Sequence, residues 1–256
     1  MKTITYKGHT LEMYDSIQDL PIWRFQEYNK FTVVASGIGS DLEDIDSGMS
    51  ALRSKIKTEP SEAIKQTVNI QQALHFIMGN ISPKMSAFCV LVYKMDGVLI
   101  TDDDLTDTGI NRMIKRLSKT RLSMALLSTF LTSFKKKVER EFEQFFPGIA
   151  NNGKTKDFYA KLRQRTVLVL QGVQGRNTAA DVAKIDKDLL SKSKPKEFHG
   201  PNGIEVQMTK EFEATLVILQ QQHASSQPRK LTTLAYYQAL EVVKDQNKQK
   251  LKAANG

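Results

Sequence analysis

Apolar positions recur every three or four residues along most of this chain, which is the period of an amphipathic α-helix. The first such run begins at Pro21, a residue suited to the first helical turn, and should end before Gly37. Its apolar positions are Ile22, Phe25, Tyr28 and Phe31. A second helix is expected from the capping box formed by Ser40 and Glu43 to about Lys57.

A third helix is expected from Pro60 to the residue before Gly79, because proline interrupts the preceding helix and glycine ends this one. The positions assigned to its buried stripe are Ile64, Val68, Ala73 or Leu74, and Ile77. Three helices therefore occupy most of the first eighty residues.

Two segments alternate with the period of a β-strand instead. Residues 4–14 alternate on both sides of Lys7-Gly8, and residues 87–93 and 98–100 flank a turn that contains Asp96-Gly97. Asp-Gly and related pairs accept the positive φ angles of tight hairpin turns. The sequence therefore predicts two β-hairpins, one at the start of the chain and one near residue 96.

Long amphipathic segments dominate from residue 108 onward. In the segment that ends at Pro147 the apolar stripe consists of Leu127, Phe130 or Leu131, Phe134, Val138, Phe142 and Phe145. In the next segment it consists of Phe158 or Tyr159, Leu162, Thr166, Val169 and Val173. Residues 147–153, which are rich in glycine and asparagine, should form the loop between the two.

The rest of the chain continues the helical pattern after one interruption. A short helix is expected around residues 179–190, an exposed loop or hinge over 191–208, and two C-terminal helices over 209–223 and 232–252. The resulting fold class is mainly α with small β-hairpins (α+β) and a helical bundle-like core. The expected parts are 1–107 with both hairpins, 108–190 with the long helices, the hinge 191–208, and 209–256.

Charge separates the front of the chain from the back. Residues 1–107 hold 10 lysines and arginines against 15 acidic residues, whereas residues 108–256 hold 27 against 13. Such a dipolar chain suits head-to-tail packing of identical subunits, or a nucleic-acid surface on its basic half. No run approaches the roughly eighteen apolar residues of a membrane helix, and no signal peptide is recognisable, so we expect a soluble protein.

One segment has the letters of a phosphate-binding loop. Residues 148–155 read GIANNGKT and match G-x-x-x-x-G-K-[ST], in which Lys154 would reach the terminal phosphates and Thr155 would hold magnesium. A phosphate loop leaves a buried strand, however, and residues 139–147 are charged, helical in period and closed by proline. We therefore interpret residues 148–155 as a loop between helices.

The acidic run after the second hairpin has no metal-binding pattern. Asp102, Asp103, Asp104 and Asp107 lack the glycine and the glutamate of a calcium loop, and the N-terminus of a helix explains them better. The four histidines are scattered without zinc spacing: His9, His75, His199 and His223. Cys89, the single cysteine, lies in an apolar run that favours burial. The sequence thus predicts no catalytic, cofactor-binding or metal site, and no enzyme.

A basic stretch is the best candidate for contact with nucleic acid. It consists of Arg112, Lys115, Arg116, Lys119 and Arg121, and Lys135, Lys136 and Lys137 add to it. Cations along one helix suit phosphate contacts, but a solvated helix face or an acidic protein partner would also explain them. Because no DNA- or RNA-binding motif accompanies the charge, we expect weak and non-specific contact only.

Short strings in the first half of the chain carry a family resemblance. Residues 19–31 (DLPIWRFQEYNKF), 36–41 (SGIGSD) and 81–84 (ISPK) resemble proteins from the structural gene blocks of tailed bacteriophages of Bacteroides-type gut bacteria, including the crAss-like group. The resemblance covers mainly residues 15–150, with a weaker echo in residues 231–240 (LTTLAYYQAL). It implies a virion component, such as a head-to-tail ring or connector subunit or a tail subunit, and carries over no catalytic residues.

The sequence and the resemblance together lead to one expected function and two alternatives. We expect a structural subunit of a phage particle, made in the host cytoplasm, that assembles with other virion proteins and with copies of itself. The acidic residues 1–107 of one copy would meet the basic residues 108–256 of the next. A nucleic-acid-binding accessory protein is the first alternative, and a nucleotide-dependent enzyme that uses Lys154 is the second. No cofactor and no membrane contact are expected.

Overall fold

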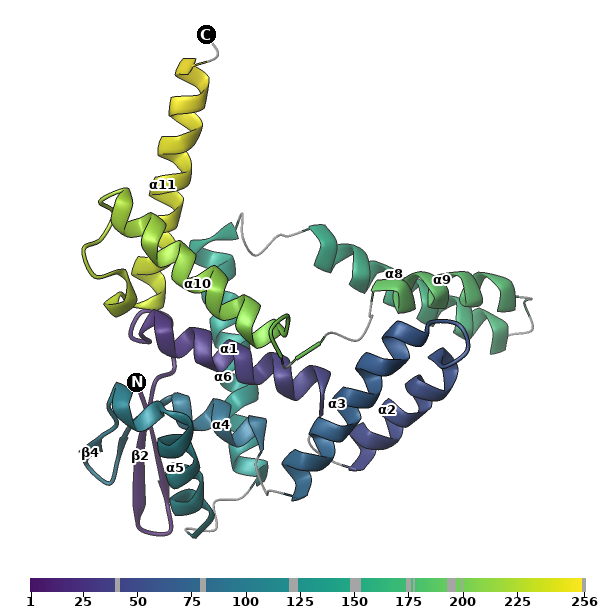
Figure 1. Cartoon of the computed structure of the whole chain (residues 1–256), viewed down its shortest axis with the longest axis horizontal. Helices are drawn as coiled ribbons and strands as arrows, with labels where there is room; N and C mark the ends of the chain where they lie inside the picture. Colours follow the sequence, from purple (N-terminus) through teal and green to yellow (C-terminus); the bar gives the residue numbers. More distant parts are fainter. Residues whose placement is uncertain are drawn as a thin grey trace. The chain divides into compact units, whose positions relative to one another are not determined.

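The computed structural model describes residues 1–39, 42–78, 82–119, 124–147, 153–173, 176, 178–192, 197–198 and 200–254. This part of the chain is mainly α-helical with one small antiparallel sheet (Figure 1), as the sequence predicts. The chain divides into two compact units: one joins Met1–Val138 to Lys196–Gly256, and the other is Glu139–Pro195. The C-terminal helices belong to the same unit as the N-terminal segment, on which they pack.

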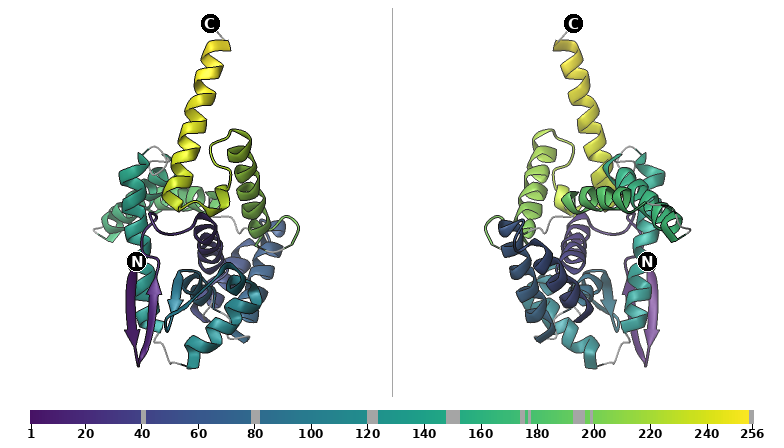
Figure 2. Two further views of the ribbon diagram at one scale, coloured as in Figure 1. Left: turned by 90° about the vertical axis from the view of Figure 1, so that its left-hand side faces the viewer. Right: turned by 90° about the vertical axis from the view of Figure 1, so that its right-hand side faces the viewer.

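Both expected hairpins form, and they pair with each other in a single sheet. The strands are β1 (Lys2–Tyr6), β2 (His9–Met13), β3 (Val92–Met95) and β4 (Val98–Leu99), in the order β1-β2-β3-β4. Lys7 and Gly8 have φ angles of 48° and 82°, and Asp96 and Gly97 have 51° and 80°, the positive values that tight two-residue turns require. Figure 2 shows β1 and β2 as a ribbon whose turn lies at the end opposite the N-terminus.

Four helices separate β2 from β3. They are α1 (Ile22–Gly37), α2 (Leu42–Lys55), α3 (Pro60–Met78) and α4 (Pro83–Val90). α1 follows the prediction, since Pro21 lies at its N-cap and Ile22, Phe25 and Tyr28 are buried. The side chains of the capping box expected at residues 40–43 lie outside the described residues.

The strand expected over residues 87–93 is wrong at its beginning, because residues 87–90 belong to helix α4. Ser82 caps this helix by accepting a hydrogen bond from the backbone amide of Met85 (3.4 Å), and Pro83 occupies its first turn. All but one of its 8 residues are buried. A helix that is buried on all sides has the same continuous apolar run as a buried strand, so the hydrophobic pattern could not separate the two.

The buried stripe expected on α3 is wrong at two of its four positions, Ile64 and Val68. Ala73 is 1 % exposed, but Ile64, Val68 and Leu74 are 67 %, 43 % and 42 % exposed. α3 packs against α2 in a helical hairpin (Figure 1), and its buried residues are Ala63, Asn69, Ile70 and Ala73. Because both sides of α3 carry apolar residues at helical spacing, the period alone could not show which side is buried.

The described part of the long segment that ends at Pro147 includes α5 (Asp107–Lys119) and α6 (Met124–Phe145), and the 3-10 helix η1 (Asp102–Leu105) precedes them. Four positions of the expected stripe on α6 are buried: Leu127, Phe130, Phe134 and Val138. Phe145 is 37 % exposed, contrary to expectation, and Phe146 is buried instead. α6 ends at residue 145, so the helical period no longer holds beyond it.

The C-terminal helices are fixed to the beginning of the chain. α10 (Ile204–Gln221) begins earlier than expected, because residues 204–208 are helical and not part of a loop, and α11 (Thr233–Ala254) follows the 3-10 helix η2 (Pro228–Lys230). The backbone amide of Thr233 donates to the carbonyl of Leu20 (2.8 Å), and the amide of Ile22 donates to the carbonyl of Leu231 (2.9 Å). Thr233 is completely buried, so this junction belongs to the core.

The second unit contains α8 (Gly153–Val173) and α9 (Ala179–Lys192) besides the end of α6. α8 and α9 pack against each other (Figure 1), and an ion pair joins Lys161 to Asp188. Thr166 and Val169, which the sequence assigned to the buried stripe of α8, are exposed. Leu168, which lies between them in the sequence, is half-buried instead.

Candidate functional site

The exposed side of α3 is uncharged. Its exposed residues are Pro60, Ser61, Ile64, Thr67, Val68, Gln71, Leu74, His75 and Met78, which we call the uncharged face of α3. At 100° per residue they span an arc of roughly 140°. None of them is acidic, lysine or arginine, although such residues make up 25 % of the chain. An exposed helix side without charge is typical of a surface that another protein covers.

Five residues of the uncharged face have the spacing of a seam between two helices. They follow one another at intervals of four, three, four and three residues: Ile64, Val68, Gln71, His75 and Met78. This alternation is that of the a and d positions in a coiled coil. Glu62 and Lys65, the acidic residue and the lysine of α3, are only partly exposed and pair with each other (3.5 Å). A helix that packed against the seam would therefore bury no lysine or carboxylate of α3.

The basic stretch expected from the sequence lies largely on α5. Four of its residues, Arg112, Lys115, Arg116 and Lys119, are exposed within an arc of roughly 100°, and we call them the basic face of α5. The opposite side of the helix is buried through Ile110, Met113, Ile114 and Leu117. No ion pair within the described part of the chain joins these four cations to an acid. Arg121 lies outside the described residues.

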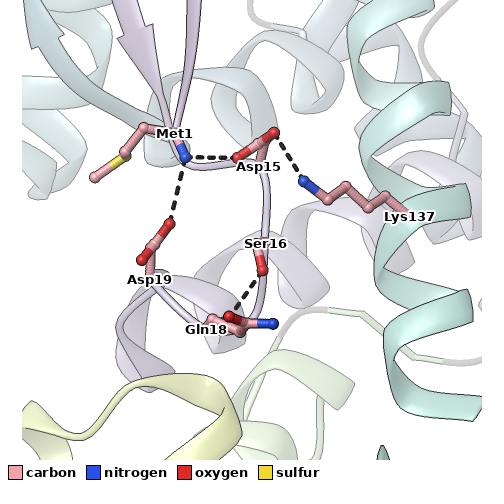
Figure 3. Close-up of polar contacts among 6 residues, drawn as sticks. All are labelled: Met1, Asp15, Ser16, Gln18, Asp19 and Lys137. Atoms are coloured by element: carbon pink, nitrogen blue, oxygen red, sulfur yellow. Dashed lines mark hydrogen bonds and ion pairs between the residues drawn. The ribbon is translucent and has the colours of Figure 1, made fainter. Parts of the chain in front are cut away.

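The three lysines of α6 have separate roles rather than extending the basic face together. Lys137 binds the Asp15 carboxylate (2.9 Å), which also pairs with the amino group of Met1 (2.8 Å; Figure 3). Burial of Asp15 opposes its ionisation, but these two cations outweigh that effect and lower the pKa of the carboxyl group. Lys136 is exposed, and Lys135 lines a cleft between α1, α4 and α6.

The acidic run after β4 forms helix N-termini, as expected. Asp104 accepts hydrogen bonds from the backbone amide and the hydroxyl of Thr101, both at 2.9 Å, and Asp107 is the first residue of α5. The hydrogen bonds from Thr101 lower the pKa of Asp104, and the nearby Arg112 adds to this effect. Among the residues that the structure describes, no three histidine, cysteine or acidic side chains are grouped so that they could hold a metal ion.

The segment with the letters of a phosphate loop falls largely outside the described residues. Nothing is described of residues 148–152 or of the side chains of Lys154 and Thr155. The flanking elements are described, and both are helices: α6 ends at Phe145 and α8 begins at Gly153. A phosphate loop needs a strand where α6 lies, so this context favours the loop between helices.

The single cysteine and one of the histidines have structural surroundings. Cys89 is completely buried in α4, and burial raises the pKa of its thiol to about 12, which makes the thiol unreactive at neutral pH. His9 pairs with Asp96 through Nδ1 (3.0 Å) and so joins the tips of the two hairpins. His75 belongs to the uncharged face of α3, and His199 lies outside the described residues.

Arg24 is a structural residue that the sequence analysis did not single out. Its guanidinium donates to the carbonyl oxygens of Val90 (3.2 Å), Val92 (2.7 Å) and Ile100 (2.6 Å), and the residue is 3 % exposed. Burial lowers the pKa of this guanidinium. These bonds tie α1 to the end of α4 and to the second hairpin. No local pattern could reveal them, because the acceptors are backbone atoms more than sixty residues away.

The described helices include none with the length and apolar composition that crossing a membrane requires. Comparisons with protein-family models, with curated proteins and with solved structures find no match to this chain.

Proposed function

We propose that this protein is a structural subunit that assembles with copies of itself through the uncharged face of α3. The observation that carries the proposal is that the exposed side of a 19-residue helix holds four large apolar residues and no lysine, arginine or carboxylate. Contact of this apolar surface with water does not stabilise the isolated chain, whereas burying the surface against another protein lowers the free energy.

The positions of the apolar residues favour a second copy of the same helix as the partner, because Ile64 and Val68 precede Gln71 by the same seven and three residues by which Met78 and Leu74 follow it. When two copies cross in antiparallel directions at a two-fold axis through Gln71, Gln71 meets Gln71 of the other copy, and Ile64 meets Met78. The two amides can then bond to each other, and apolar side chains meet apolar side chains on both sides of the axis. One surface thus serves both partners, as a two-fold contact between identical subunits requires.

The resemblance of residues 15–150 to phage structural proteins supports placing this assembly in a virion, as a head-to-tail ring or connector subunit or a tail subunit. The charge split supports a further, head-to-tail contact between the acidic residues 1–107 of one copy and the basic residues 108–256 of another. A two-fold contact and a head-to-tail contact together build a closed assembly of dihedral symmetry.

A Gln71→Cys variant tests the two-fold contact directly. Mild oxidation should link two copies at residue 71, because this position lies at the axis. Ile64→Cys is the matched control, since 14 residues along the helix separate Ile64 from its own copy by roughly 21 Å, far beyond disulfide reach. Cys89 is completely buried and should not link in either variant.

The measurement is the fraction of covalent dimer on a non-reducing gel, together with the sedimentation of the unmodified protein at several concentrations. We expect dimers of Gln71→Cys only, and self-association of the unmodified protein. Equal linking of both variants would refute the antiparallel two-fold pair. A monomer at every concentration, alone and with virion proteins, would refute the proposed function.

Nucleic-acid binding is the second candidate function, and the basic face of α5 favours it. If this face contacts phosphates, the affinity for duplex DNA should fall steeply with salt. Replacing Arg112, Lys115 and Arg116 by glutamine should then make this dependence shallower. The negative slope of the logarithm of the association constant against the logarithm of the salt concentration should lose about one unit of magnitude for each lost contact. We expect weak binding only, measured by fluorescence anisotropy. Nanomolar affinity at physiological salt would move nucleic-acid binding to first place.

A further inference from the structure

We propose that a cleft between α1, α4 and α6 binds a small organic anion with an apolar body. The cleft has a volume of about 360 Å³ and lies within the first unit. Pockets for small ligands begin at roughly 300 Å³. Six polar residues contribute to its lining: Thr32, Ser36, Lys84, Ser128, Thr132 and Lys135.

The polar groups of the cleft favour a negatively charged ligand. Lys84 and Lys135 bring two ammonium groups to the same cleft, and none of the residues that line it is acidic. Lys84 makes no ion pair with any acid in the part of the chain that the structure describes. The hydroxyls of Ser128 and Thr132 likewise have no hydrogen-bond partner there, so they can donate to a ligand. Two cations and several hydroxyl donors are the groups that hold phosphate, sulfonate or carboxylate.

The floor of the cleft is apolar, and aromatic contacts connect the helices beneath it. It includes Tyr28 and Ala87, which are 6 % and 2 % exposed, and the half-buried Leu131. Edge-to-face aromatic contacts connect the three helices beneath it. The ring centroids of Tyr28 and Phe134 are 5.0 Å apart, and those of Phe88 and Phe130 are 5.5 Å apart. An inorganic ion would leave this floor in contact with water. The ligand class that uses the whole cleft is therefore an anion joined to an aromatic or aliphatic group.

The test uses 1-anilinonaphthalene-8-sulfonate, a fluorescent aromatic sulfonate, as the probe. We expect saturable binding by the full chain. The Kd should rise about threefold or more in Lys84→Met or Lys135→Met and at least about tenfold in the double variant, because each lysine contributes a charge-assisted contact. Lys136→Met is the matched control: Lys136 neighbours Lys135 on α6 but does not line the cleft, so the Kd should change by less than about twofold.

Two further measurements separate this site from other binding surfaces. Inorganic phosphate, compared with chloride at equal ionic strength, should compete with the probe in the unmodified protein and not in the double variant. An Ile64→Asp variant should bind the probe as the unmodified protein does, since α3 does not line the cleft. The proposal is overturned if N-phenyl-1-naphthylamine, which lacks the sulfonate, binds equally well, if Lys136→Met weakens binding as much as Lys84→Met, or if Ile64→Asp abolishes binding. The last outcome would place the probe on the uncharged face of α3 and would leave the proposed function standing.

Discussion

Arg24→Met should lower the free energy of unfolding by about 3–5 kcal/mol, because three buried carbonyl groups lose their donor at once. The guanidinium bonds Val90, Val92 and Ile100, and methionine has a similar length but no donor. Each unsatisfied buried acceptor costs about 1–3 kcal/mol, and partial rearrangement or water entry reduces the sum. Urea denaturation followed by circular dichroism measures the change in the midpoint at constant m-value.

Arg53→Met is the control for the loss of one positive charge, because Arg53 is exposed on α2 and should change the free energy by less than about 0.5 kcal/mol. The loss of unfolding free energy in Arg24→Lys should lie between those of Arg24→Met and Arg53→Met, since a single ammonium cannot span three carbonyl groups on different elements. If Arg24→Met unfolds at the same urea concentration as Arg53→Met, the three hydrogen bonds do not hold α1 to the second hairpin.

The turns of the two hairpins are the features that the sequence predicted best, and the reason is local. Lys7-Gly8 and Asp96-Gly97 lie at turns whose positive φ angles restrict the choice of residues, so each turn can be predicted from its own sequence. The turn residues could not predict that the two hairpins pair with each other. β2 and β3 are separated in sequence by four helices, and their pairing depends on how those helices pack.

Helix α4 and helix α3 show two limits of the hydrophobic pattern. Residues 87–90 are buried on every side, and a fully buried segment has no polar positions that could separate the period of a helix from that of a strand. α3 has the opposite property, because it carries apolar residues on two sides. The pattern correctly predicted a helix there, but it assigned the exposed Ile64 and Val68 to the core. A second apolar side that the fold does not use is itself the sign of an interaction surface.

The candidate sites depend on contacts between elements far apart in sequence, which explains why sequence reasoning found them only in part. The basic face of α5 comes from one helix, and its residues were named from the sequence. The cleft takes Thr32, Lys84 and Lys135 from three helices, and only Lys135 was named from the sequence, as part of the basic stretch. Lys136 and Lys137 are adjacent to Lys135 and look equivalent in the sequence, yet Lys137 pairs with Asp15, Lys135 lines the cleft and Lys136 does not line it.

Ile64→Asp should weaken self-association by at least about 100-fold, which corresponds to about 2.7 kcal/mol. In the two-fold pair each new carboxylate would be buried against Met78 of the other copy without a cation to neutralise it, and the pair contains two such sites. The isolated chain should fold normally, because residue 64 is 67 % exposed and an acid near the start of α3 is compatible with the helix dipole. Sedimentation equilibrium measures the Kd, and thermal unfolding verifies the fold.

Val242→Asp, at a 54 % exposed apolar position of α11, is the matched control and should associate like the unmodified protein. If both substitutions weaken association equally, the contact does not depend on α3 and is governed by the net charge of the chain.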